Sequence, residues 1–130
     1  NSKGEILIHK RTMAKDHNPG YFDITNGGVV SCGESYYENA IREIEEEIGV
    51  KNPKLKFLFK LKYEDEDSKV FVGVYKQLYD GKLKFQKEEV QFGKFVSLDE
   101  LKKIMKKEKF CPDGLAVFKK YLAGLKKWQR

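Results

Sequence analysis

The fold of this chain is decided by the segment that begins Gly28-Val-Val-Ser-Cys-Gly-Glu34 and resumes after seven residues with Arg42-Glu-Ile-Glu-Glu-Glu-Ile-Gly-Val50. Between the two parts, Ser35 and Glu38 have the spacing of a capping box, which begins a helix. Gly49 stands where the helix would end, because glycine is common at helix C-termini. The motif Gly28–Val50 therefore predicts a loop, a helix and a second loop.

The expected helix has two chemically different sides. With 100° per residue, its apolar side chains fall on one side: Tyr37, Ala40, Ile41, Ile44 and Ile48. Glu43, Glu46 and Glu47 gather on the other side. The chain carries a net charge of +6, yet six glutamates and a single arginine lie between Glu34 and Glu47. Composition alone fits either a solvated helix face or a cation site that attracts a polyanion.

Carboxylates at this spacing can serve as ligands of a divalent cation. Residues three and four apart on a helix are neighbours, so Glu43, Glu46 and Glu47 can present oxygens to shared ions. Magnesium prefers such oxygen ligands, and like charges crowded on one face are unfavourable unless cations neutralise them. Gly27 and Gly28 have no side chains, which lets a phosphate or an ion approach the backbone closely. We expect a Mg²⁺ site, with Mn²⁺ as the alternative ion and the Gly27 carbonyl as an extra ligand.

The stretch Gly28–Val50 resembles a complete Nudix box, the signature of hydrolases that cleave a diphosphate linked to another moiety. The resemblance implies one α/β Nudix domain over residues 1–130, with a mixed sheet between helices. It implies a magnesium-dependent pyrophosphohydrolase acting on a nucleoside diphosphate derivative or a related small metabolite. Nudix domains usually have a strand before the one that starts at Glu5, so we expect that the sequence lacks this N-terminal strand.

Roles for individual residues also follow from the resemblance. Glu46 and Glu47 correspond to metal ligands, and Glu43 to a ligand or to the base that activates water. A further acid often comes from a loop near the last strand, where Glu89 fits best and Glu88 next. Supporting roles fall to Gly28, Glu34, Arg42 and Gly49, with an Arg42–Glu34 ion pair that orients the carboxylates.

A narrower resemblance, to Nudix proteins akin to isopentenyl-diphosphate isomerase, rests on residues outside the motif: His9-Lys-Arg11, Pro19–Asp23, Phe110–Gly114 and Tyr121-Leu122. The isomerase reaction itself is disfavoured, because Gly27 and Val29 stand where the isomerase has a catalytic cysteine and a metal-binding histidine. A second alternative is a non-catalytic Nudix module that binds nucleotides or RNA. The intact set of acids favours hydrolysis over both.

The rest of the chain predicts further short elements. We expect strands at 5–11, 22–24, 28–30, 55–63, 70–79, 83–85 and 92–96, with a hairpin turn at Asp80-Gly81. Ser97 and Glu100 begin a second helix with Leu101, Ile104 and Met105 inward. Pro112 begins a last helix, whose apolar stripe is Leu115, Phe118, Leu122 and Leu125.

Composition excludes several classes of protein. No stretch approaches the 18 to 20 apolar residues that a membrane span needs, and Cys32 and Cys111 lack the spacing of a zinc site. We therefore expect an intracellular, cytoplasmic protein that binds a small-molecule diphosphate. Lys10 and Arg11 are candidate ligands for the substrate phosphates. The many lysines of the last two helices are typical of solubilising residues, so nucleic acid is not the favoured partner.

Overall fold

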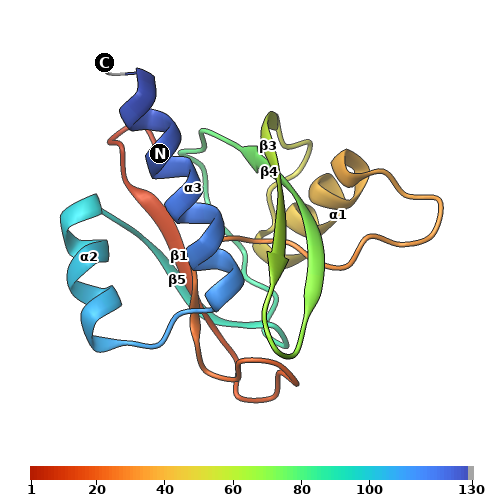
Figure 1. The fold of residues 1–130 in the computed structure, drawn as a ribbon, viewed down its shortest axis with the longest axis horizontal. Coiled ribbons are helices and arrows are strands. Elements are labelled where there is room, and N and C mark those ends of the chain that lie inside the picture. Colours follow the sequence, from red (N-terminus) through yellow and green to blue (C-terminus); the bar gives the residue numbers. More distant parts are fainter. Residues whose placement is uncertain (129–130) are drawn as a thin grey trace.

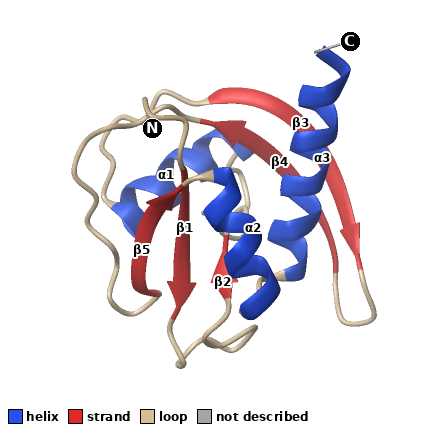
Figure 2. Cartoon of the chain, turned by 90° about the vertical axis from the view of Figure 1, so that its left-hand side faces the viewer, coloured by secondary structure: helices blue, strands red, loops and turns tan. Residues whose placement is uncertain are grey.

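The computed structural model describes residues 1–128. The elements follow the order β1 (Ile6–Arg11), β2 (Phe22–Asp23), α1 (Tyr36–Ile48), β3 (Lys56–Glu64), β4 (Lys69–Lys76), β5 (Val90–Val96), α2 (Leu98–Lys107) and α3 (Pro112–Trp128). The strands form a three-stranded sheet, β2-β1-β5, and a two-stranded sheet, β3-β4. The sheets lie between α1 on one side and α2 and α3 on the other (Figures 1 and 2). This arrangement confirms an α/β fold with sheets between helices.

Strand pairing is antiparallel within both sheets. In β1, Ile6 pairs with Val96 of β5 and His9 pairs with Asp23 of β2. Among the described residues, the parallel contact is an isolated bridge between Phe22 and Phe110, which places the start of α3 beside β2. The mixed character of the expected sheet is therefore limited to this bridge.

The main core lies on the face of β1 that points away from α1. Its buried members are Ile8, Phe22, Val96, Leu101, Phe110 and Phe118. Because successive side chains of a strand point to opposite faces, His9 and Arg11 lie on the other face of β1, toward the acidic helix. His9 is buried there, and burial together with Arg11 and Lys15 lowers its pKa to about 4.

Two expected strands are absent from the described residues. Residues 28–30 form no ladder, and residues 83–85 run along the end of α1 instead of leaving a hairpin at Asp80-Gly81. The amide of Lys84 donates to the Ile48 carbonyl at 2.9 Å. In the other segment, the Val29 carbonyl accepts a bond from Asn39 of α1. A strand pattern in the sequence cannot reveal such contacts with a helix.

The hairpin of the molecule lies between β3 and β4, where Asp65 Oδ1 accepts bonds from the amides of Asp67 and Ser68. Three apolar residues expected on buried stripes are partly exposed, namely Tyr37, Met105 and Leu125.

None of the helices within residues 1–128 has the length and apolar character that crossing a membrane would require.

Candidate active site at the acidic helix

Both ends of α1 are fixed by local backbone chemistry. Ser35 and Glu38 form the complete capping box, in which each side chain accepts a bond from the other residue's amide at 3.1 Å. At the other end Gly49 has a φ of +71°, and a Cβ there would lie 2.8 Å from Lys84 Cβ. Only glycine tolerates both the positive φ and this close approach. The predicted helix and its two end signals are confirmed.

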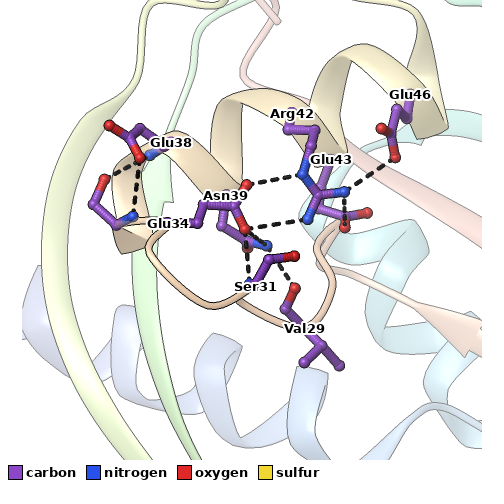
Figure 3. A network of polar contacts seen from close by, with 9 residues as sticks. Val29, Ser31, Glu34, Glu38, Asn39, Arg42, Glu43 and Glu46 are labelled. Atoms are coloured by element: carbon purple, nitrogen blue, oxygen red, sulfur yellow. Dashed lines mark hydrogen bonds and ion pairs between the residues drawn. The ribbon is translucent and has the colours of Figure 1, made fainter.

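Arg42 is the centre of an ionic network on the polar face of α1 (Figure 3). Its Nε and Nη2 donate to the two carboxylate oxygens of Glu34 at 2.8 and 3.2 Å. Its Nη1 lies 3.1 Å from Glu43 Oε1 and 3.4 Å from Glu46 Oε2. The structure thus brings Glu34, Glu43 and Glu46 together around one guanidinium group.

The same network holds the loop that precedes the helix. Glu34 Oε2 accepts a bond from the Ser31 amide at 2.9 Å, and bonds from Arg42 and Ser31 lower the pKa of Glu34 to about 2. Asn39 Nδ2 donates to the Val29 carbonyl at 2.9 Å and to Glu34 Oε2 at 3.3 Å. Asn39 was not among the residues predicted for the site, although a polar residue directed toward the buried side of a helix is an available signal.

Glu43 occupies the space above Gly28. A Cβ built on Gly28 would overlap the Glu43 carboxylate, whereas a Cβ on Gly27 would meet nothing within 4 Å. Burial raises the pKa of Glu43, and the Arg42 guanidinium opposes this increase. A side chain at position 28 would therefore force the Glu43 carboxylate out of its present position.

Glu47 is the most strongly perturbed acid of the helix. Burial raises its pKa to about 8, and the charges of Glu43 and Asp23 add to the effect. Its Oε2 atom is buried and has no hydrogen-bond partner among residues 1–128. A buried carboxylate oxygen without a donor is unfavourable, and such atoms mark places where an ion or a water is expected.

The fourth acid, Glu89, reaches this region from the chain that precedes β5. The Thr12 amide donates to the Glu89 carbonyl at 3.3 Å, and the Glu89 carboxylate forms an ion pair with Lys15. The charges of Glu89 and Lys15 both act on the pKa of Glu47, so all three groups lie near one another. Glu88 is exposed. Of the two alternatives, Glu89 is thus the residue that lies beside the acidic helix.

The four acids do not close around a single point. Within residues 1–128, the potential ligand atoms that all lie within 4.8 Å of one another belong to a different group: Asp23, Cys111 and Asp113. Our expectation that Glu43, Glu46 and Glu47 converge was therefore too simple. Arg42 lies 3.1 Å from Glu43 and 3.4 Å from Glu46, whereas the pKa of the buried Glu47 carboxyl is also raised by the charge of Asp23 in β2. Like charges also repel in the absence of a cation.

The Asp23 group has a structural explanation. Asp23 Oδ1 accepts bonds from the Thr25 amide and hydroxyl at 3.0 Å each. The same oxygen lies so close to Gly114 that a Cβ there would overlap it. The carboxylate therefore links β2 to the first turn of α3. Burial raises the pKa of Asp23 to about 6.

The two basic residues at the end of β1 lie on opposite faces of the sheet. Lys10 lies over the Phe22 ring, 5.6 Å from its centroid, on the core side. Arg11 lies on the acidic side, where it lines a polar hollow of about 230 Å³ together with Lys15 and Glu89. Its Nη2 donates to the His17 carbonyl at 2.9 Å, and its buried Nε has no partner among the described residues. Of the two candidate phosphate ligands, the structure brings only Arg11 toward the acids.

Comparison with known proteins gives the same family as the motif. The model of the NUDIX domain matches residues 1–116. An uncharacterized Nudix hydrolase of Pseudomonas aeruginosa is 31% identical over 122 residues, which cover 94% of this chain and 72% of that protein. One from Streptomyces coelicolor is 36% identical over 129 residues, with 98% and 69% covered.

Solved structures agree. DR0079 of Deinococcus radiodurans is 27% identical with a TM-score of 0.76, covering 87% of this chain and 72% of that one. A MutT protein of Methanosarcina mazei is 27% identical with a TM-score of 0.77, covering 98% and 88%. On the motif, the fold and these relatives, the chain belongs to the Nudix hydrolase family.

Proposed function

We propose that this protein hydrolyses the diphosphate linkage of a nucleoside diphosphate derivative or a related small metabolite, with Mg²⁺ or Mn²⁺ as its cofactor. One observation carries the proposal: the Oε2 atom of Glu47 is buried and has no partner among the described residues. The negative charges of Glu43, Asp23 and Glu89 act on this carboxyl, and the positive charge of Lys15 offsets only part of their effect. A divalent cation would supply the missing partner and offset the like charges.

The residues present fit such an ion. Glu46 and Glu47 are the proposed metal ligands, with Glu89 and the exposed Gly27 carbonyl completing the oxygen donors. All four offer the hard oxygen atoms that magnesium prefers. Glu34 and Arg42 support them, since the bidentate pair fixes the start of the helix and positions the Glu43 carboxylate. When bound, the metal would neutralise the charge of the diphosphate and activate a water molecule.

Hydrolysis then requires a water molecule, a base and a held diphosphate. Water attacks one phosphorus atom, the bond from that atom to the leaving oxygen breaks, and the proton of the water passes to a carboxylate. Glu43 is the proposed acceptor, because burial raises its pKa and so makes the carboxylate a better base. Arg11 is the proposed contact to the substrate phosphates, since its guanidinium lines the hollow beside Glu89. Lys10 is not proposed for this role, because its ammonium lies over the Phe22 ring on the other face of the sheet.

The proposed substrate class rests on the family. One solved relative by fold, the NUDIX domain of NrtR from Shewanella oneidensis, was crystallised with ADP ribose, at 17% identity and a TM-score of 0.72. Such a ligand contains the diphosphate that the proposed site would hold.

The two cysteines are both free, which is consistent with the intracellular location that we propose.

A substrate screen tests the proposal. Purified protein would be incubated with a panel of nucleoside diphosphate sugars, dinucleoside polyphosphates and nucleoside triphosphates, with Mg²⁺ or Mn²⁺, and the phosphate-containing products would be separated. We expect turnover of at least one diphosphate, lost on chelation and in the Glu46→Gln variant, which keeps shape but removes charge. Nucleotide binding without turnover across the panel would favour a binding module. Conversion of isopentenyl diphosphate to its isomer would favour the isomerase.

A further inference from the structure

The loop between β1 and β2, residues 12–20, delivers a positive charge to the acidic site. The loop is fixed at its start, where Thr12 Oγ1 donates to the Glu88 carbonyl at 3.0 Å. It is fixed again where Arg11 Nη2 reaches the His17 carbonyl at 2.9 Å. Between these contacts, Lys15 forms its ion pair with the Glu89 carboxylate. The loop therefore holds one ammonium group at the edge of the acid cluster.

The Lys15 ammonium compensates part of the negative charge there. Lys15 and Glu89 are 26% and 34% exposed, so the pair is partly shielded from water. Lys15 is also the cation whose charge opposes the increase in the pKa of Glu47. Of the other nearby cations, Arg42 is engaged by Glu34, Glu43 and Glu46, and Arg11 donates to the His17 carbonyl. Lys15 is thus the cation that pairs with the Glu89 carboxylate and opposes the increase in the pKa of Glu47.

We propose that Lys15 is a tethered counter-ion that competes with the divalent metal for the Glu89 carboxylate. Metal uptake breaks the Lys15–Glu89 pair, and residues 12–20 lose one of the contacts that hold them over the hollow. The inference rests on the proposed function, since it requires that the acids bind a divalent ion. Its physical basis is that a 2+ ion beside Glu89 repels the ammonium and takes the oxygen that the ammonium holds.

The competition has a measurable size. A partly exposed ion pair is worth up to about 1 kcal/mol, which corresponds to a factor of about five in an equilibrium constant. Removing the Lys15 charge while keeping the aliphatic stem should therefore tighten metal binding by up to about fivefold. The matched control is Lys87→Met, because Lys87 is an exposed lysine two residues from Glu89 and has the same charge. Any general effect of net charge appears in both variants.

The experiment is a titration of three proteins with Mn²⁺ alone: the wild type, Lys15→Met and Lys87→Met. The concentration of free Mn²⁺ is measured by electron paramagnetic resonance at each step. Amide hydrogen exchange of residues 12–20 is measured with and without Mn²⁺. We expect tighter binding in Lys15→Met than in the control, by up to about fivefold, and faster exchange in the wild-type loop once metal is bound. Binding by Lys15→Met alone, with none in the wild type, would also support the competition.

The outcomes separate the two proposals. If the wild type binds Mn²⁺ and Lys15→Met binds it equally or more weakly than Lys87→Met, the counter-ion role is wrong and the proposed function stands. If none of the three proteins binds Mn²⁺, the metal-dependent function is wrong, and the competition that depends on it is wrong as well.

Discussion

Replacing Glu47 by glutamine should stabilise the metal-free protein at alkaline pH. Burial raises the pKa of this carboxyl from its ordinary 4.5 to about 8. Between these two values the folded protein holds a proton that the unfolded chain has lost, so the free energy of unfolding falls as the pH rises through that range. Glutamine has nearly the same shape and carries no charge. The variant therefore avoids the loss of stability.

The size of the effect follows from the same shift. A displacement from 4.5 to about 8 corresponds to almost 5 kcal/mol if all of it appears as stability, at about 1.36 kcal/mol per pH unit. Because Glu47 is not completely buried, solvent screening reduces the gain, and we expect about 2 kcal/mol at pH 8. For a chain of 130 residues this corresponds to an increase in Tm of about 7 °C.

The assay is urea unfolding of the wild type and Glu47→Gln at pH 5 and pH 8, with a chelator present. At pH 5 the wild-type carboxyl is protonated, so the two proteins should be nearly equal in stability. At pH 8 the variant should be the more stable, and replacing the chelator by Mg²⁺ should stabilise the wild type alone. Glu45→Gln serves as the control, because Glu45 is exposed on the same helix. Equal losses of stability from pH 5 to pH 8 in wild type and Glu47→Gln would refute the reasoning.

Three further predictions concern the glycines and the arginine of the motif. Gly28→Ala should lower kcat by at least about tenfold, because the new Cβ displaces the carboxylate above it, whereas Gly27→Ala should stay close to wild type in the same assay. Arg42→Lys keeps the charge but loses the planar guanidinium that binds both oxygens of Glu34. Metal affinity measured by titration should drop about tenfold, with the circular dichroism spectrum unchanged. Unchanged affinity would contradict the supporting role of Arg42. Gly49→Ala should lower the free energy of unfolding by about 1–2 kcal/mol in urea, because of its positive φ and the contact with Lys84; a neutral result would mean that the helix end relaxes freely.

The sequence predicts those parts of the fold that depend on local chemistry. The capping box, the αL glycine and the apolar periodicity specify α1 through residues only a few positions apart. The main strands β1, β3, β4 and β5 have the β-branched and aromatic residues that favour extended backbone. Residues 28–30 and 83–85 were wrongly expected as strands, because their hydrogen bonds depend on α1, which no local pattern encodes.

The site is predicted less completely. The motif identified the acids and the Arg42–Glu34 pair from spacing and resemblance, and the pair is present in the structure. Lys15 and Asn39 were not predicted. Lys15 pairs with Glu89, which lies far from it in the sequence. Asn39 donates to the Val29 carbonyl in the loop before the helix. The separation of Lys10 from Arg11 depends on which face of β1 meets the core. That choice is fixed by tertiary packing, with Ile8 in the core cluster.

Calorimetric titration with Mg²⁺ and Mn²⁺, performed with and without a non-hydrolysable diphosphate analogue, tests the role of the acidic helix most directly. We expect heat of binding for the wild type, with release of protons near pH 7 because Glu47 must ionise, and loss of that heat in Glu47→Gln. Absence of binding by the wild type under all of these conditions would contradict a metal site built from Glu46, Glu47 and Glu89.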